Sequence, residues 1–370
     1  MATGQKASPR PRPDDVDRAL LDALQAGLAL SETPFAEVGQ RLEISEDEVI
    51  SRTARLREGG IVRQISPIFD TRTLGYRSSL VAAKYPSDRL FDAAAIVSGH
   101  PGVSHNYRRT HDFNLWFTVA VSPDSELGLE RTVEVLSEAT SAESMRLLPT
   151  LDLYKIAVQL DMRGGDERDK KEKPARDPED RRSDPPPPPS EADRQLIRVL
   201  QGDLPLIPQP FAPLAQAAGT DVTSILDALS RFQELGFMRR FAAILNHRRA
   251  GFGANGMAVW RAPEEQLDEI GPRMAAFRHV SHCYRRPTYP DWPYSVFTMV
   301  HARDQQQCEE TIAAIAAETG LTDPADRAIL YSTYEFKKIR LEYFTPDYES
   351  WERAAAAGDP LPRWARSGSE

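Results

Sequence analysis

The chain has 370 residues, of which 41% are hydrophobic and 27% are charged, with a formal net charge of −9 at pH 7. This length allows two or three domains, and the composition is that of a globular protein. The sequence contains no apolar run of about 18 residues and no secretory signal, so we expect no membrane span and a cytoplasmic location. The negative charge argues against non-specific nucleic-acid binding. Two cysteines cannot form a disulfide framework.

The sequence repeats itself. When the first half is shifted by 176 positions, Pro34-Phe35-Ala36 aligns with Pro210-Phe211-Ala212 and Arg63 aligns with Arg239, without a gap. Between the halves, residues 162–190 are nearly all charged residues, Pro and Gly, a composition typical of an extended linker. We therefore predict two homologous halves joined by this linker, and an internal pseudo-dimer.

Each half begins with three predicted helices. In the first half, DRALLDALQAGLAL places its leucines on one face, and PFAEVGQRL starts at Pro34, a favoured first-turn residue. The third helix, SEDEVISRTARLREGG, has Ser45 as its N-cap and Glu48 completing a capping box. IVRQISPIFDTRTLGY then predicts a small β-wing, so these elements form a winged helix-turn-helix.

The rest of each half predicts strand, helix, two strands, helix and strand, which is the ferredoxin-like order. The predicted fold is therefore α+β, a tandem repeat of a winged helix-turn-helix and a ferredoxin-like (βαββαβ) domain. The predicted boundaries are a loose tail at 1–16, winged helix-turn-helix 1 at 17–76, ferredoxin-like domain 1 at 77–161, the linker at 162–190, winged helix-turn-helix 2 at 191–252, ferredoxin-like domain 2 at 253–345, and a loose tail at 346–370.

The predicted helix-turn-helix segments are acidic. Residues 17–62 hold nine acidic and five basic residues, and residues 193–238 hold five acidic and three basic residues. A recognition helix needs Lys and Arg on its exposed face, and the second copy offers only Arg231 there. We therefore expect that these segments do not bind DNA.

A His-x-Tyr-x-Arg cluster occurs once in each half, in VSHNYRRTH and in VSHCYRR. Residues two apart on a strand point to the same face, so each cluster forms a row. The row residues are His105, Tyr107 and Arg109, extended by His111, in the first half, and His282, Tyr284 and Arg286 in the second. The simpler interpretation is a duplicated core strand with ordinary histidines, and a Pro-rich loop YPDWPY that is only rigid.

The residue types favour an anion site over this simpler interpretation. Arginine pairs with carboxylates through two hydrogen bonds, tyrosine donates a directional hydrogen bond, and histidine carries a proton near neutral pH. Further candidate binding residues are Tyr289 in the aromatic loop and, in or after the wings, Arg63, Arg239, Arg240 and His247. Such a concentration of cations in an acidic protein predicts a polyanionic ligand.

The two-part layout resembles the AsnC/Lrp regulators, and the motifs resemble one branch of that fold. HNYRRTHDFNLWFT is similar to the HNYxREHxFNLWFT signature of one subunit type of sirohaem (siroheme) decarboxylases. CYRRPTYPDWPYSVFTMVH and GFMRRFAAILNHRRAGF are similar to the signatures of the partner type. The resemblance covers both halves and corresponds to the fused form of the enzyme. It departs at Thr110, where the family commonly has Glu.

The resemblance implies a carboxy-lyase that removes the acetate carboxyl groups at C12 and C18 of sirohaem and gives 12,18-didecarboxysirohaem, for haem d1 or an alternative haem route. It implies His105, His111 or His282 as the general acid and Arg109 and Arg286 as carboxylate clamps. Tyr107, Tyr284 and Tyr289 would orient the carboxylates, and the wing cations would bind other side chains of the macrocycle. The more arginine-rich second half is expected to be the main ligand-holding half.

No separate cofactor is expected, because decarboxylation is not an oxidation and the substrate carries its own iron. A rival role for His105 or His282 is axial ligation of that iron. The alternative function is an AsnC/Lrp-type regulator that senses a tetrapyrrole or an amino acid. A homodimer of the fused chain is left open by the sequence.

Overall fold

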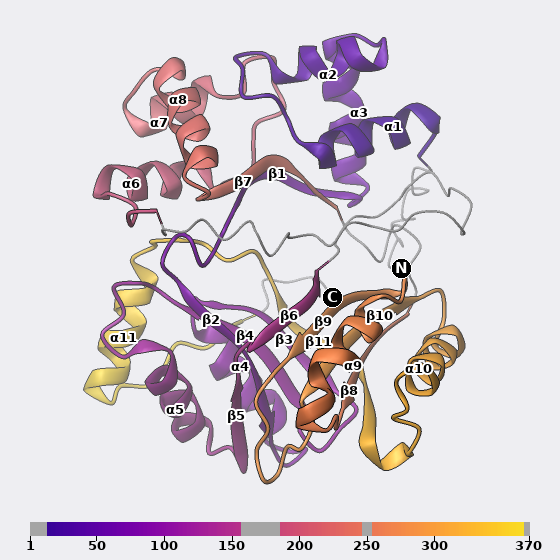
Figure 1. Ribbon diagram of the computed structural model, residues 1–370. Helices are drawn as coiled ribbons and strands as arrows, with labels where there is room; N and C mark the ends of the chain where they lie inside the picture. The colour runs from indigo at the N-terminus through magenta and orange to yellow at the C-terminus, as the bar shows by residue number, and fades with distance from the viewer. Residues whose placement is uncertain (1–12, 157–185, 246–253, 366–370) are drawn as a thin grey trace, which may run out of the picture. The chain divides into compact units, whose positions relative to one another are not determined.

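The computed structural model describes residues 13–156, 186–245 and 254–365 of the chain, which folds into two compact units (Figure 1). A helical unit contains residues 13–70 and 186–245, and a sheet unit contains residues 71–156 and 254–365. Each unit therefore combines the corresponding parts of both sequence halves. Most of the predicted linker and part of the N-terminal tail lie outside the described residues. Within the described residues, no helix is long and apolar enough to span a membrane.

The helical unit contains the two predicted helix-turn-helix copies. The helices are α1 (Asp15–Ala26), α2 (Pro34–Leu42), α3 (Glu46–Glu58), α6 (Glu191–Leu200), α7 (Ala212–Ala218) and α8 (Val222–Glu234). The amide of Glu48 donates to Ser45 Oγ at 3.2 Å, which confirms the N-cap, but the Glu48 carboxylate pairs with Arg52 instead of completing the predicted capping box. The periodic leucines of α1 are fully buried, as the pattern predicts.

The described residues do not form the two β-wings that the sequence predicts. Each half contributes one strand, β1 (Val62–Phe69) or β7 (Met238–Leu245), and these two strands pair with each other antiparallel instead of forming a hairpin within each half. The loops after α1 and α6 join this ribbon equivalently: Leu28 N donates to Phe241 O at 2.8 Å, and Leu204 N donates to Ile65 O at 2.7 Å. An unpaired strand edge leaves backbone N–H and C=O groups without partners, and here the homologous strand of the other half supplies these partners.

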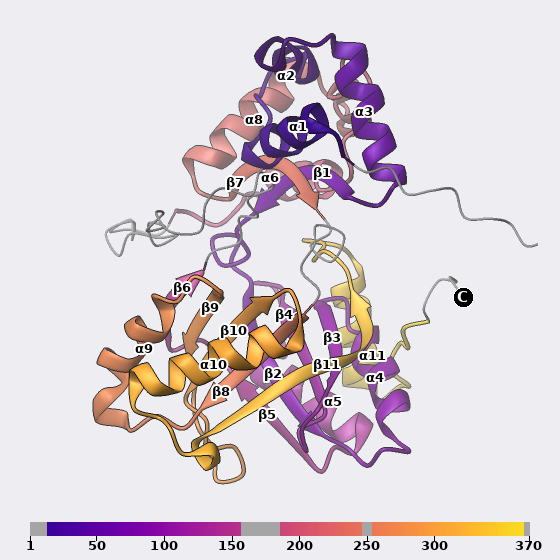
Figure 2. The same ribbon diagram turned by 90° about the vertical axis from the view of Figure 1, so that its right-hand side faces the viewer.

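The sheet unit contains both ferredoxin-like repeats (Figures 1 and 2). The first repeat consists of β2 (Arg77–Lys84), α4 (Leu90–Gly99), β3 (Val103–Arg109), β4 (Leu115–Val121), α5 (Gly128–Thr140), β5 (Ser144–Leu148) and β6 (Asp152–Ile156). The second consists of β8 (Ala254–Trp260), α9 (Leu267–Ala275), β9 (Val280–Arg285), β10 (Val296–Ala302), α10 (Gln305–Thr319) and β11 (Arg327–Lys338), with short 3-10 helices at Glu264–Gln266 and Pro324–Asp326. The second repeat has the predicted βαββαβ order, and the first has the same order with its predicted last strand divided into β5 and β6.

The last strands of the two repeats join the repeats together. The strand order is β5-β2-β4-β3-β11-β8-β10-β9-β6. The first part of β11 pairs with β8 of its own repeat, and its second part pairs with β3 of the other repeat. In the first repeat the chain breaks at Pro149, so β5 pairs with β2 and β6 pairs with β9 of the second repeat. The expected internal pseudo-dimer is therefore built by strand pairing.

Three apolar clusters hold the sheet unit together. One packs β2, β3 and β4 against α4 and α5, and a second packs β8, β9 and β10 against α9 and α10. The third contains residues of both repeats, and its buried members are Ala82, Phe113, Trp116, Leu148, Met257, Val259, Trp292, Phe297 and Leu330. Alternation along β4 explains the layers, because Leu115 and Phe117 join the first cluster and Trp116 joins the third.

Within the predicted loose tail at 346–370, the described residues 346–365 are packed onto the sheet unit instead. They include α11 (Asp347–Ala357), and Trp351 of this helix is only 1% exposed within the first apolar cluster. The following residues reach Trp364, whose amide donates to Ala95 O of α4 at 2.9 Å. The prediction of a loose tail from composition is wrong here because the buried Trp351 anchors the helix, although most residues around it in the sequence are polar or small.

We predict that Trp351→Ala lowers the free energy of unfolding by about 3–5 kcal/mol, because it leaves a large cavity in the first apolar cluster. Urea unfolding measures this change. Arg353→Ala on the same helix is the matched control, because the side chain of Arg353 is 71% exposed. Equal stabilities of the two variants would show that α11 is only loosely docked.

A buried histidine beneath α11 predicts a pH dependence of stability. His100 is 2% exposed, accepts a hydrogen bond from the amide of Gly102 on Nδ1, and has its ring centroid 4.4 Å from that of Trp351. Burial, together with the charge of Lys337, lowers the pKa of His100 to about 3.

Unfolding would raise this pKa to about 6.5, so the unfolded chain binds the extra proton and stability falls as the pH drops from about 6.5 towards 3. His100→Asn keeps a hydrogen-bond acceptor for Gly102 and removes this proton. We predict a slope of stability against pH that is smaller by up to about 1.4 kcal/mol per pH unit in the variant. Identical slopes would contradict a neutral, buried His100.

Candidate functional site

The two predicted rows exist and have matching geometry. On β3 the ring of His105 lies 6.2 Å from that of Tyr107 at an interplanar angle of 34°, and on β9 the ring of His282 lies 5.9 Å from that of Tyr284 at 33°. The guanidinium carbon of Arg109 lies 5.9 Å from the ring centroid of Tyr107. In the second row, the Arg286 guanidinium carbon lies 4.8 Å from the Tyr284 centroid. Each half therefore presents a stacked His-Tyr-Arg row.

Arg286 is a buried cation and Arg109 is a partly buried one, and both make few polar contacts. Arg109 Nη1 donates to Leu330 O at 3.0 Å, and Arg286 Nη1 donates to Leu148 O, so each arginine bonds to a carbonyl of the other repeat. The Nε of each is buried without a hydrogen-bond partner. Burial lowers the pKa of both to about 10, which leaves them charged near neutral pH. Among the described residues, neither has a carboxylate within ion-pair distance.

His111 lies in the loop between β3 and β4, where the first repeat meets the aromatic loop of the second. Its Nδ1 accepts a hydrogen bond from the amide of Phe113 at 3.0 Å, and its ring centroid lies 5.3 Å from that of Trp292. Burial lowers the pKa of His111, partly opposed by the charge of Asp112. His111 thus extends the first row, as predicted, and is surrounded by aromatic rings.

A cavity of about 580 Å³ lies beside the first row. Arg109 and His111 line it, together with three residues that the sequence analysis did not single out, Lys84, Arg108 and Asn114. The opposing acids in its wall are Asp112 and Glu143. The cavity therefore brings a histidine and three cations together, a suitable arrangement for binding carboxylates.

The aromatic loop 287–294 is fixed by the first repeat. Tyr289 and Trp292 pair through both backbone amides, and Tyr289 OH donates to Leu147 O at 2.5 Å. Arg146 of β5 forms a bidentate ion pair with Asp291, with both N–O distances 2.9 Å, and Ser144 Oγ donates to Asp291 at 2.8 Å. Sequence reasoning missed this clamp, because a pair 145 residues apart has no local signal.

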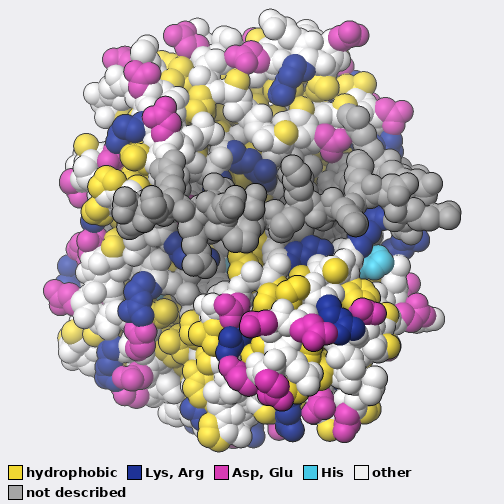
Figure 3. Space-filling view, viewed as in Figure 1, with side chains coloured by type: hydrophobic (Ala, Val, Ile, Leu, Met, Phe, Trp, Pro, Cys, Tyr) yellow, Lys and Arg dark blue, Asp and Glu magenta, His cyan; other side chains and the backbone are white. Residues whose placement is uncertain are grey.

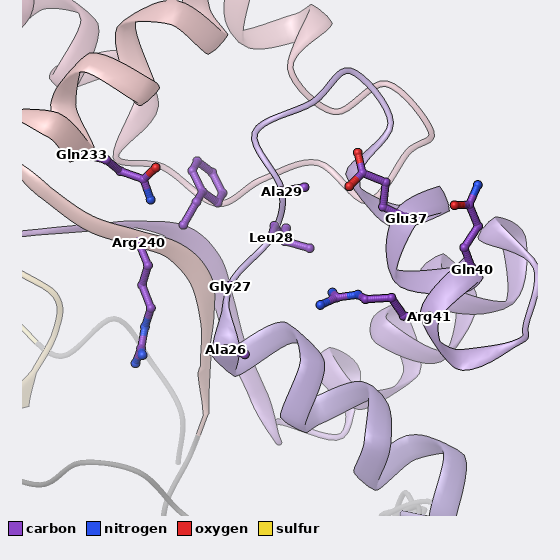
Figure 4. A pocket seen from close by; sticks show the side chains of 10 residues that line it. Ala26, Gly27, Leu28, Ala29, Glu37, Gln40, Arg41, Gln233 and Arg240 are labelled. Atoms are coloured by element: carbon purple, nitrogen blue, oxygen red, sulfur yellow. The ribbon is translucent and has the colours of Figure 1, made fainter. Parts of the chain in front are cut away.

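The predicted wing cations lie in the helical unit, whereas the rows lie in the sheet unit. Arg63 is on β1 and Arg239 and Arg240 are on β7, with Arg239 paired to Asp70 at 2.7 Å. Arg240 lines a cavity of about 590 Å³ between the loop after α1 and helix α2, although Figure 4 shows its guanidinium directed away from the labelled residues of that cavity. His247 lies outside the described residues. A shared role of these cations with the rows stays a prediction.

Equivalent arginines of α3 and α8 are paired with acids within the helical unit. Arg55 pairs with Asp17 at 2.7 Å, and the equivalent Arg231 pairs with Asp193 at 2.5 Å. On the face shown in Figure 3, acidic side chains are interspersed with basic ones. These ion pairs are consistent with the expectation that the segments do not bind DNA, which stays a prediction.

Comparison with known proteins assigns families to both units. The model of the siroheme decarboxylase NirDL-like HTH domain matches residues 17–63 and 193–239, and the model of the AsnC-like ligand binding domain matches residues 73–155 and 249–337. A siroheme decarboxylase of Hydrogenobacter thermophilus is 38% identical over 90% of this chain and 96% of its own length. The chain belongs to the sirohaem decarboxylase family.

A solved structure agrees with this assignment. The crystal structure of the siroheme decarboxylase NirDL in co-complex with an iron-uroporphyrin III analogue matches with a TM-score of 0.72 and 32% identity, over 93% of this chain and 99% of that one. Separate subunits of the family also match. In Desulfovibrio desulfuricans the alpha subunit is 42% identical over 40% of this chain and 84% of its own length, and the beta subunit is 36% identical over 42% and 97%. This chain is thus a fused form, as its repeat predicts.

The clamp on the aromatic loop gives a testable prediction. Asp291→Asn removes the charge that Arg146 binds, so the loop should open more often, by about 1 kcal/mol or a five-fold change. Hydrogen exchange at the amides of Tyr289 and Trp292 measures this opening. Glu269→Gln, which breaks an exposed pair with Arg273 on α9, is the control and should leave these amides unchanged. Unchanged exchange in Asp291→Asn would show that the ion pair does not hold the loop.

Proposed function

We propose that this chain removes the carboxyl groups of the C12 and C18 acetate side chains of sirohaem as carbon dioxide and gives 12,18-didecarboxysirohaem. The observation that carries the proposal is the pair of arginines, Arg109 and Arg286, each of which ends a His-Tyr row, has a buried Nε without a hydrogen-bond partner, and has no carboxylate partner among the described residues. A buried cation without a counter-ion is costly unless a ligand supplies the anion. Sirohaem carries eight carboxylates. Because the chain belongs to the sirohaem decarboxylase family, sirohaem is the polyanion that we propose as its substrate.

The proposed chemistry needs one proton for each carboxylate that leaves. Protonation of a pyrrole carbon makes an iminium-like electron sink. The C–CO₂ bond then breaks, its electron pair flows towards the ring, and carbon dioxide leaves. Transfer of the added proton to the exocyclic carbon restores the pyrrole and completes the methyl group. Electrons remain within the macrocycle, so the step needs no oxidant or reductant.

The residues of the first row suit these steps. His105 or His111 would donate the proton, Arg109 would hold a carboxylate with Tyr107 orienting it, and the aromatic wall around His111 would exclude water. In the second half, Arg286 would hold a carboxylate, and Tyr284 and Tyr289 would orient it. We infer that no cofactor is needed beyond the iron that the substrate carries. Axial ligation by His105 or His282 remains the rival role for those histidines.

We propose the first half as the main catalytic half, instead of the second half that the sequence favoured. The cavity of about 580 Å³ has Arg109 and His111 in its wall, whereas Arg286 of the second row is only 9% exposed. The second half would complete the site through Trp292, which contacts His111. Several of the more numerous arginines of the second half pair with acids, as Arg285 does with Asp152, and so carry less weight for ligand binding.

Anaerobic incubation of the full chain with sirohaem, followed by mass spectrometry, tests the proposal. We expect two successive losses of the mass of carbon dioxide. His105→Ala and His111→Ala should each lower the rate by about 10²- to 10⁴-fold, which is the usual contribution of a general acid, and His282→Ala should lower it less. His279→Ala is the control, because His279 precedes β9 and is outside both rows.

An unchanged tetrapyrrole mass in the presence of wild-type protein would contradict the proposal. DNA binding that weakens with salt, together with no mass change, would instead support a tetrapyrrole- or amino-acid-sensing regulator. Wild-type rates in all three histidine variants would leave the decarboxylase standing and refute the assigned proton donors.

A further inference from the structure

A serine precedes the histidine of each row and contacts its ring. Ser104 Oγ lies 3.0 Å from Nδ1 of His105, and Ser281 Oγ lies 2.7 Å from Nδ1 of His282. Neighbouring residues on a regular strand point to opposite faces, so a seryl hydroxyl does not ordinarily reach the next side chain. The contact therefore needs a local change in the strand.

Both strands have this change at the serine. In β3 the pairing passes from Val103↔Val119 to His105↔Thr118 and skips Ser104. In β9 it passes from Val280↔Val300 to His282↔Met299 and skips Ser281. Such an irregularity leaves one residue unpaired and re-aims its side chain. The two halves have diverged at most positions, yet they keep the same Val-Ser-His triplet and the same irregularity.

Each serine also has an acceptor for its own proton. Ser104 Oγ lies 3.0 Å from Thr118 Oγ1, and Ser281 Oγ donates to Met299 O at 3.4 Å. A protonated imidazole donates from both nitrogens, so its Nδ1–H needs an acceptor. The serine oxygen can accept this hydrogen bond while its hydroxyl hydrogen points to Thr118 or to the Met299 carbonyl. The arrangement therefore suits a histidine that must hold a proton and then release it.

We propose that Ser104 and Ser281 are positioning residues, which hold the imidazoles of His105 and His282 through Nδ1 so that Nε2 is the nitrogen that transfers the proton. This inference rests on the proposed decarboxylation for its catalytic meaning. The serines touch the histidines and not the reacting atoms, so they act through ring orientation and protonation state. Partners of this kind for metal-bound histidines change activity by about 10- to 100-fold.

Among the described residues, the rows and the paired strands place the following groups beside these rings. Tyr107 stacks beside His105, and Lys338 is the strand partner of His105 on β11. Tyr284 stacks beside His282, whose strand partners, Ile156 and Met299, are uncharged. The serine hydroxyl is thus a neutral contact that can be removed without changing the charge around either ring.

The experiment compares Ser104→Ala, Ser104→Thr, Ser281→Ala and Ser281→Thr in the full chain. For Ser104→Ala we expect kcat to fall by about tenfold with little change in KM, because the substrate carboxylates are bound elsewhere. Ser104→Thr keeps the hydroxyl and should restore most of the rate. Ser79→Ala on β2 is the control, because the hydroxyl of Ser79 bonds only to the adjacent Leu80 carbonyl.

A second measurement does not depend on turnover. Long-range ¹H–¹⁵N spectra of histidine-labelled protein report which ring nitrogen carries the proton. We expect the His105 and His282 signals to move towards a mixture of tautomers in the corresponding alanine variants and to stay in place in the threonine variants and in Ser79→Ala.

The outcomes separate the two proposals. Unchanged kcat together with unchanged ¹⁵N signals in both alanine variants would overturn the role of the serines. An altered ¹⁵N pattern in a protein whose wild type does not decarboxylate sirohaem would support the positioning and refute the proposed function. A loss of rate that threonine does not restore, with unchanged ¹⁵N signals, would reduce the serines to packing residues.

Discussion

The sheet unit depends on the pairing of each repeat's last strand with the other repeat. β11 continues from β8 onto β3, and β6 leaves its own repeat to pair with β9. Backbone hydrogen bonds thus fix the two rows in relation to each other, since β3 and β9 are the strands that carry them. The same connection supplies the carbonyls of Leu330 and Leu148 to Arg109 and Arg286. The arginine of each row therefore depends on a backbone carbonyl of the other repeat.

Arg109 and Arg286 place two cations in equivalent positions of the repeats, without a carboxylate partner among the described residues. Removing a guanidinium from water costs several kcal/mol after relaxation, and one carbonyl contact compensates only part of this cost. The structure holds two such groups in equivalent places, and each lies near an aromatic ring of its own row. Arginine suits this role better than lysine because its planar fork keeps its charge when buried and binds carboxylates through two hydrogen bonds.

The helical unit has the helices of a helix-turn-helix domain, and arginines of its third helices form ion pairs within the unit. The arginines of α3 and α8 pair with aspartates at the starts of α1 and α6. These aspartates also cap their helices, which leaves their side chains fully engaged. In place of two separate wings, β1 and β7 form a single ribbon that joins the halves. Both units therefore use the internal repeat for association of the two halves.

The sequence by itself determined the repeat, the order of elements, the Ser45 cap and the two rows, because these follow from local periodicity and from residue types at fixed spacing. Tertiary structure decided what depends on partners distant in the chain. The pairing of β1 with β7, the docking of Trp351, the clamp of Arg146 on Asp291 and the contact of His111 with Trp292 join residues that are more than 140 positions apart or that lie in different repeats. Many strands could pair with a given strand edge, and many apolar surfaces could bury a given indole. Which partner is used depends on how the whole chain packs. For the same reason, the number of arginines favoured the second half as the main ligand-holding half, whereas burial and ion pairing favour the cavity beside the first row.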